Sequence, residues 1–234
     1  YKKEKFIEAI NNLETISFDL NKIKQEQLRV FTLGKSYDKI KNFDKAYDNF
    51  VKANEISSQL KGKNINKDFY IEKIKIRNSF FSNLKKEEWS STKLPDFQNN
   101  PIFMVGFPRS GTTLLDNILS SHPSIEVIEE KSMVPKLIQS LNHLAKNDLH
   151  NLKNINSEQI QKLRSNYFDD LYSHVENKDN SKIYIDKLPL NIIYIGEIFK
   201  IFPQAKFIFS IRHPCDCVLS CFMQTFAINN AMAN

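Results

Sequence analysis

Two hydrophobic patterns divide the chain. Through residues 1–90 the apolar positions recur every three or four residues, with few Gly or Pro, which is typical of amphipathic helices. Beyond Pro101, short apolar runs alternate with helical stretches. The patterns predict strands at 102–106, 124–128, 182–186 and 206–211, and helices at 112–121, 190–202 and 214–226 and within 132–146 and 157–176. Because strands that alternate with helices form parallel sheets, the expected fold class is α/β, with helices flanking the sheet.

The helical region contains one stretch that follows the register of a tetratricopeptide repeat. The matching positions are Val30, Leu33, Gly34, Tyr37, Ala46, Phe50 and Ala53. The small residues among them would allow two helices to approach closely. Val30 replaces the usual Trp, and Ser58 replaces the usual Pro. We therefore predict an all-α, tetratricopeptide-like module, with a plain helical hairpin as the alternative.

A change in composition separates the two patterns. Residues 64–86 are predicted to form the last helix of the first part. Residues 89–101 are rich in Ser, Asn and Pro, which is typical of a linker. The predicted organisation is a helical module over 1–90, a linker over 91–100 and an α/β domain over 101–234.

The composition is that of an ordinary globular protein. Of 234 residues, 41% are hydrophobic and 26% are charged, and no apolar run approaches the roughly 20 residues of a membrane span. The net charge of +6 arises in residues 1–100, where Lys residues are scattered between acidic ones, so we expect a solvated surface and no nucleic-acid binding. Three Cys are too few for a disulfide framework and favour a reducing compartment, so a cytoplasmic protein is expected.

A glycine-bounded loop follows the first predicted strand. Just before the next predicted helix the chain reads Gly106-Phe107-Pro108-Arg109-Ser110-Gly111-Thr112-Thr113. A strand, loop and helix start of this kind typically form a phosphate-binding site, because the backbone N–H groups of the loop and the positive end of the helix dipole point toward the same bound anion. The spacing resembles a Walker A loop, but Thr112 stands where that motif requires Lys, and Arg109 supplies a cation from inside the loop. The glycine spacing makes a P-loop nucleotide kinase the rival hypothesis, and Thr112 counts against it.

A second cation follows the last predicted strand. Arg212 comes after 206–211, at the carboxyl end of a parallel strand, where open α/β sheets bind ligands. Its planar guanidinium matches a phosphate bidentately. Ser220 lies two helical turns further along the predicted helix and would add a hydroxyl donor from the same side.

In combination these motifs resemble those of sulfotransferases that use 3′-phosphoadenosine 5′-phosphosulfate (PAPS). Residues 108–114 are similar to the 5′-phosphosulfate loop, in the Arg-containing form of protein-tyrosine sulfotransferases, and 206–214 with Ser220 are similar to the 3′-phosphate site. The resemblance covers residues 100–226 and implies a P-loop-type sulfotransferase fold. It also implies a set of donor-binding residues, which are Arg109, Ser110, Gly111, Thr112, Thr113, Arg212 and Ser220.

The same resemblance implies the catalytic residues. In protein-tyrosine sulfotransferases the general base is a Glu that follows the loop Arg at the same spacing as Glu130 follows Arg109. The resemblance therefore implies Glu130 as the base, with Glu129 as the alternative. In residues 186–189, Asp-Lys-Leu-Pro, the base His of small-molecule sulfotransferases is missing, which strengthens the assignment of a Glu base. Lys187 and Arg109 would then stabilise charge on the leaving phosphate during an in-line displacement at sulfur that needs no metal.

The implied acceptor is a tyrosine hydroxyl of a protein or peptide, with a glycan or small hydroxyl compound still open. The helical repeats could also bind protein partners, and a scaffold with an inactive second domain is a further alternative. Cys215, Cys217 and Cys221 fall in one predicted helix without a partner cluster, so no metal site is expected. The chain starts at Tyr1 without Met and ends 22 residues after Arg212, so we expect a fragment, incomplete at its C-terminus, of a longer protein.

Overall fold

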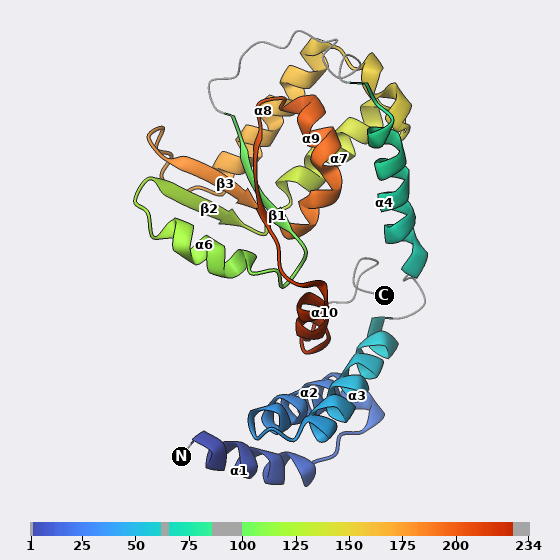
Figure 1. Ribbon diagram of the computed structural model, residues 1–234, viewed down its shortest axis with the longest axis vertical. Coiled ribbons are helices and arrows are strands. Elements are labelled where there is room, and N and C mark those ends of the chain that lie inside the picture. The colour runs from blue at the N-terminus through green and yellow to red at the C-terminus, as the bar shows by residue number, and fades with distance from the viewer. Residues whose placement is uncertain (1, 62–65, 86–99, 227–234) are drawn as a thin grey trace. The chain divides into compact units, whose positions relative to one another are not determined.

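A computed structural model of the protein describes residues 2–61, 66–85 and 100–226 (Figure 1). The chain clusters into two units, one formed by residues 1–73 and 218–234 and the other by residues 74–217. Except for Asn100, the predicted linker lies outside the described residues, so the predicted domain bounds stay predictions. Among the helices of the described part, none is long and apolar enough to cross a membrane.

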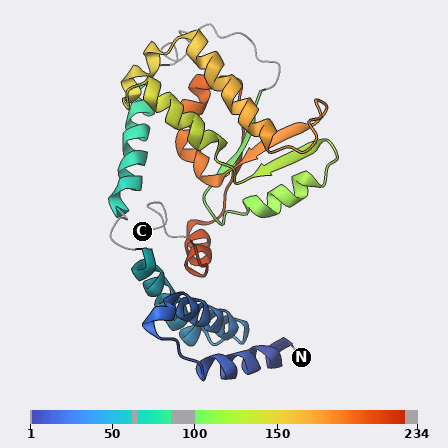
Figure 2. The same cartoon turned by 180° about the vertical axis from the view of Figure 1, so that it is seen from behind.

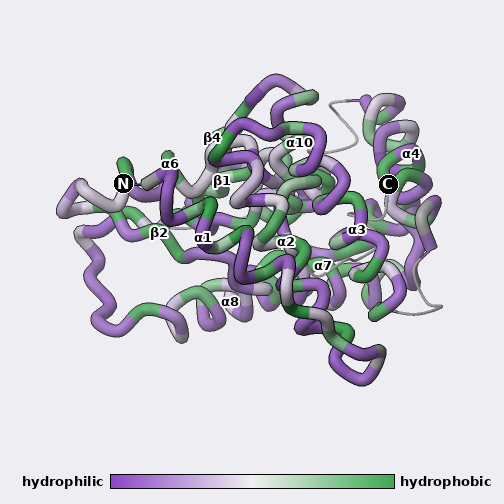
Figure 3. Tube along the Cα trace, turned by 90° about the horizontal axis from the view of Figure 1, so that it is seen from below, coloured by the Kyte–Doolittle hydropathy of each residue, from purple (hydrophilic) through white to green (hydrophobic). Residues whose placement is uncertain are grey.

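The first unit is built from helices. Its elements are α1 (Lys2–Glu14), η1 (Leu20–Lys22), α2 (Ile23–Lys39), α3 (Phe43–Lys61) and the start of α4 (Lys67–Ser82). Both hydrophilic and hydrophobic residues occur along α2 and α3, as expected for helices with one apolar face (Figure 3). A Cβ on Gly34 would lie only 3.0 Å from the ring of Phe50, so the glycine lets α2 approach α3 closely. The predicted helical region is confirmed, whereas the tetratricopeptide register stays a prediction.

The second unit contains a four-stranded parallel sheet in the order β2-β3-β1-β4. The strands are β1 (Ile102–Gly106), β2 (Ile125–Glu129), β3 (Ile183–Lys187) and β4 (Lys206–Ser210). Each begins and ends within one residue of its predicted bounds, and the α/β fold class is confirmed. Because all four strands run in the same direction, their carboxyl ends share one edge of the sheet.

Helices surround this sheet (Figures 1 and 2). They are α6 (Thr112–Ser120), α7 (Met133–Leu144), η3 (Leu149–Asn154), α8 (Ser157–Ser173), η4 (Pro189–Tyr194) and α9 (Ile195–Ile201). The last helix, α10 (Pro214–Phe222), follows β4, and its residues from 218 onward cluster with the first unit. Apolar residues of α7, α8 and α9 pack with Phe103 and Val105 of β1 to form the core, and α6 contacts β1 and β2. The helix predicted over 190–202 starts as the 3₁₀ segment η4, which has Pro189 in its first turn.

Helix α4 is anchored to α9 by its second half. The side chain of Arg77 donates a hydrogen bond of 2.7 Å from Nε to Oε1 of Glu197, whose side chain is fully buried. A Cβ on Gly196 would lie 2.5 Å from the ring of Phe81, so only glycine allows this ring to lie against α9. The helix predicted over 64–86 is observed over Lys67–Ser82; residues 83–85 are described and not helical, so the prediction was too long at this end, and 64, 65 and 86 lie outside the described residues.

Candidate functional site

The loop between β1 and α6 lies tightly against the neighbouring strand β4. A Cβ on Gly106 would lie 2.7 Å from the backbone oxygen of Ser210 and 2.8 Å from Oγ of Ser110, so a larger residue would displace the backbone. Arg109 and Gly111 have left-handed backbone conformations, with φ of 70° and 102°. The predicted strand, turn and helix start are thus observed, with glycine at both positions that require it.

The first turn of α6 opens toward this loop. Helix α6 begins at Thr112, which is buried, followed by the exposed Thr113. The first N–H groups of a helix have no acceptor within the helix. In the part of the chain that the structure describes, the buried Oγ of Ser110 has no hydrogen-bond partner either. Because buried hydroxyl groups normally have partners, an anion in the loop would supply an acceptor for these donors.

The segment after β4 is tied to the same loop. Oγ of Ser210 donates a hydrogen bond of 3.0 Å to the backbone oxygen of Ser110, and Nη1 of Arg212 donates one of 3.3 Å to the backbone oxygen of Arg109. Nε of Arg212 also lies 3.6 Å from Oδ2 of Asp216. The two predicted phosphate motifs are therefore adjacent through Arg109 and Arg212.

Ser220, the last of the predicted donor-binding residues, belongs to a different unit from the loop. It lies on α10, half-buried, in the part of the chain that clusters with the first unit. Its expected role beside Arg212 stays a prediction.

Lys187 occupies the centre of the charged cluster at the carboxyl edge. It is the last residue of β3 and its side chain is fully buried. Its Nζ lies 2.5 Å from Oε1 of Glu129, 3.5 Å from Oε1 of Glu130 and 3.9 Å from Oδ2 of Asp116. The backbone N–H of Glu130 donates a hydrogen bond of 2.8 Å to the carbonyl oxygen of Lys187. The predicted base and the predicted cation are therefore neighbours.

The two Glu residues differ in geometry. Glu129 is in register with Lys187 in the sheet and forms the closer contact with its ammonium group. Glu130 follows the end of β2 in a left-handed conformation with φ of 52°, and its side chain is 62% exposed. A Glu in this conformation carries backbone strain, which is frequent at functional sites.

Asp116 is a site residue that the sequence analysis missed. It lies on α6, one turn after Thr112, and both residues are buried. Its carboxylate is the third one around Lys187. A spacing of four residues places Asp116 on the same face of α6 as Thr112, but no motif in the sequence connects it with Lys187.

Asp186, next to Lys187, belongs to the core. Adjacent strand residues point to opposite faces of a sheet, and the Asp186 carboxyl accepts a hydrogen bond of 3.1 Å from the hydroxyl of Tyr167 on α8. Complete burial raises the pKa of Asp186 to about 7, against a contrary effect of the Tyr167 hydrogen bond. Burial likewise raises the pKa of Tyr167. This carboxyl therefore lies outside the charged cluster.

The three Cys residues lie close together in the sequence, on one helix. Cys215, Cys217 and Cys221 lie on α10, and none of them is in a disulfide. Within the described ranges, no group of three or more His, Cys, Asp or Glu side chains is arranged to hold a metal ion.

A parallel α/β sheet with a glycine-bounded loop between β1 and α6, and with cations at its carboxyl edge, is an arrangement in which other proteins bind phosphorylated ligands. A family model described as the sulfotransferase family matches residues 101–234, and the chain belongs to this family.

The chain is also similar to individual proteins. It is 31% identical to an uncharacterized protein of Aquifex aeolicus (strain VF5), over 94% of this chain and 29% of that protein. It is 27% identical to the protein-tyrosine sulfotransferase of Drosophila melanogaster, over 47% of this chain and 23% of the relative. It is 25% identical to protein-tyrosine sulfotransferase 1 of Danio rerio, over 47% of this chain and 32% of the relative. The chain thus spans less than a third of the length of these relatives.

Proposed function

We propose that the protein is an enzyme that transfers the sulfuryl group of PAPS to the hydroxyl of a tyrosine in a protein or peptide. The observation that carries the proposal is the arrangement at the carboxyl edge of the sheet. There the loop of Arg109 adjoins Arg212, and Lys187 lies 3.5 Å from Glu130. Two anion-binding motifs thus lie in the same unit as a carboxylate and a cation suited to group transfer.

The residues of the loop fit the donor. Close backbone approach at Gly106, the unpartnered buried hydroxyl of Ser110 and the start of α6 favour an anionic group in the loop. When bound, PAPS supplies an activated sulfuryl group and a good leaving group. The loop residues Arg109, Ser110, Gly111, Thr112 and Thr113 would hold its 5′-phosphosulfate, and Arg212 with Ser220 its 3′-phosphate.

Glu130 is proposed as the general base. Its side chain is exposed, so an acceptor hydroxyl can reach its carboxylate and transfer a proton to it. Glu129 forms the closer ion pair with the buried Lys187 and thereby orients the ammonium group. Lys187 and Arg109 then offset the negative charge that develops on the oxygen of the departing phosphate, where a fixed cation lowers the barrier most.

A tyrosine acceptor is supported by two features. The segment Asp186-Lys187-Leu188-Pro189 lacks the base His of small-molecule sulfotransferases, and a Glu lies beside Lys187 instead. Two of the relatives are protein-tyrosine sulfotransferases by name. Acceptor screening with tyrosine peptides, glycans and small phenols distinguishes the three acceptor classes.

Calorimetric titration with 3′,5′-phosphoadenosine tests the donor class directly. We expect binding without metal, and a loss of about tenfold or more in affinity for both Arg109→Ala and Arg212→Ala, because each removes a charged hydrogen-bond donor. Lys206→Ala is the matched control, because Lys206 is an exposed cation at the opposite end of β4. Unchanged affinity in both Arg variants would contradict the proposal, and a preference for ATP with magnesium would favour a nucleotide kinase.

A further inference from the structure

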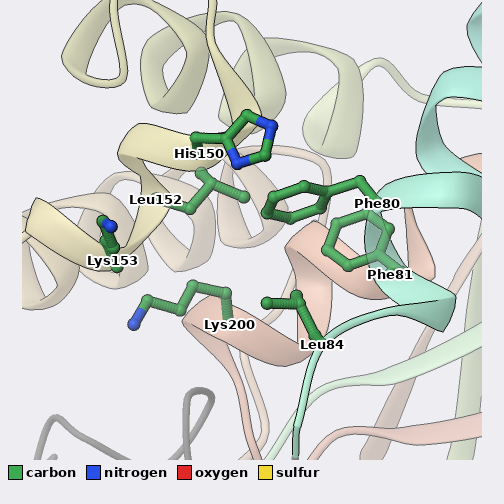
Figure 4. Close-up of a pocket in the computed structure, with 7 residues that line it drawn as sticks. All are labelled: Phe80, Phe81, Leu84, His150, Leu152, Lys153 and Lys200. Carbon is green, nitrogen blue, oxygen red and sulfur yellow. The ribbon is translucent and has the colours of Figure 1, made fainter.

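A cavity lies in the sheet-bearing unit, between the end of α4, the 3₁₀ segment η3 and the end of α9 (Figure 4). Its volume is about 230 Å³. The residues that line it are Phe80, Phe81, Leu84, His150, Leu152, Lys153 and Lys200. None of these residues belongs to the candidate functional site.

One side of this cavity is apolar and aromatic. The rings of Phe80 and Phe81 meet edge to face with centroids 5.0 Å apart, and the ring of His150 meets Phe80 at the same distance. Leu84 and Leu152 complete the wall. An apolar cavity of about 150 Å³ accommodates benzene, so about 230 Å³ holds one six-membered ring with a short polar arm.

The other side of the cavity carries positive charge. Figure 4 shows the Nζ atoms of Lys200 and Lys153 on the side away from Phe80 and Phe81. Lys200 is only 4% exposed, whereas Lys153 is exposed. Within the described part of the chain, Lys200 has no ion-pair partner, and no Asp or Glu lines the cavity.

A buried ammonium group without a counter-ion is unfavourable. Burial accordingly lowers the pKa of Lys200. An anionic group from a ligand would remove this cost, and its attached ring would occupy the apolar side. The positive charge on one side of the cavity and the apolar wall on the other therefore both fit a ligand that joins an anionic group to a ring.

The cavity is separate from the carboxyl edge of the sheet. Lys200 lies in the last turn of α9, and the chain then enters β4 at Lys206. The cavity thus lies toward the edge where β4 begins, whereas Arg212 follows the end of that strand. An inference about it does not depend on the proposed sulfuryl transfer.

We propose that this cavity is a binding site for a small aromatic carboxylate. The ring lies between Phe80, Phe81 and Leu152, and the carboxylate pairs with Lys200. Lys153 adds a second, solvent-exposed cation at the rim.

The test is calorimetric titration of the whole protein with phenylacetate, compared with its neutral counterpart phenylacetamide. We expect phenylacetate to bind and phenylacetamide to bind about tenfold more weakly or worse, because a charged hydrogen bond is lost. Lys200→Met keeps the length of the side chain and removes its charge, so it should weaken phenylacetate binding by about tenfold or more. Lys206→Met is the matched control with unchanged binding.

A second variant addresses the shape of the site. Leu84→Trp adds volume to the apolar side and leaves both Lys residues in place, so it should also weaken phenylacetate binding. Melting curves of each variant establish that it is folded. Three results would overturn the proposal: no phenylacetate binding by the wild-type protein up to the solubility limit, equal binding of the amide, or equal affinity in Lys200→Met and the wild-type protein.

Discussion

The ammonium group of Lys187 lies 3.5 Å from a carboxylate oxygen of Glu130, although the two residues are 57 positions apart in the sequence. They meet because β2 and β3 are parallel neighbours and end at the same edge of the sheet. The backbone strengthens the relationship, since the N–H of Glu130 donates to the carbonyl oxygen of Lys187. The proposed base and the proposed catalytic cation are therefore held together by the sheet itself and not by a long loop.

Replacement of Lys187 by Met should abolish most of the proposed sulfuryl transfer. We expect kcat to fall by about 10²–10³, the range for loss of one preorganised electrostatic group, with a smaller change in KM. The measurement is steady-state transfer to a tyrosine peptide. Lys206→Met serves as the control. If kcat of a folded Lys187→Met protein falls by less than tenfold, Lys187 is not a catalytic residue.

The two neighbouring Glu residues should respond differently to substitution. Glu130→Gln keeps the shape of the side chain but cannot accept a proton, so kcat should fall by about 10²–10⁴. Glu129→Gln should have a much smaller effect, because Glu129 only orients Lys187 in the proposed mechanism. The comparison uses kcat of both variants and the acid limb of the pH profile. If Glu129→Gln shows the larger loss, the two roles are reversed.

The loop glycine Gly106 should not tolerate a methyl group. In Gly106→Ala the new Cβ would meet the backbone oxygen of Ser210 at 2.7 Å, and backbone is costly to displace. We expect a loss of about 1–3 kcal/mol in the free energy of unfolding, together with weaker binding of 3′,5′-phosphoadenosine. Denaturant unfolding and calorimetry measure the two effects.

A second glycine provides the control for that prediction. In Gly34→Ala the atoms nearest to the new Cβ would be those of the Phe50 ring, at 3.0 Å, in the helical unit. This variant should lose stability without a change in nucleotide affinity. Unchanged affinity in Gly106→Ala as well would mean that the loop geometry does not govern binding.

The sequence was sufficient to predict the sheet and much of the charged cluster. The strands were recognisable because each is a short apolar run bounded by loop residues, the usual signature of buried parallel strands. Arg212 was recognisable because it follows the last strand, and the carboxyl ends of parallel strands meet at one edge of the sheet. Lys187, Glu129 and Glu130 were assigned through the resemblance to protein-tyrosine sulfotransferases. The strand pattern thus predicted the sheet and Arg212, whereas the family motifs predicted Lys187 and the two Glu residues.

Contacts between distant elements could not be predicted. Asp116 resembles an ordinary polar residue of a helix, and only the position of α6 beside β2 and β1 brings it within 3.9 Å of Lys187. The buried pair of Arg77 and Glu197 joins residues 120 positions apart. Such pairs depend on how helices pack on the sheet, which no short motif encodes.

Asp186 should make the stability of the protein depend on pH. Its pKa is raised from 3.8 to about 7 by burial, so between these values the folded protein retains a proton that the unfolded chain has released. The contribution of this group to the free energy of unfolding is therefore fully present below pH 4 and is lost as pH rises toward about 7. The maximum slope for one group is about 1.4 kcal/mol per pH unit.

Asp186→Asn isolates this effect, because Asn cannot titrate but can still accept the hydrogen bond from Tyr167. We expect the variant to gain stability relative to the wild-type protein as pH rises from 4 to 7, measured by urea unfolding at each pH. Asp169→Asn, at an exposed position on α8, should show no comparable trend. A constant difference between Asp186→Asn and the wild-type protein over this range would mean that the Asp186 carboxyl is already ionised in the folded state at pH 4, despite its burial.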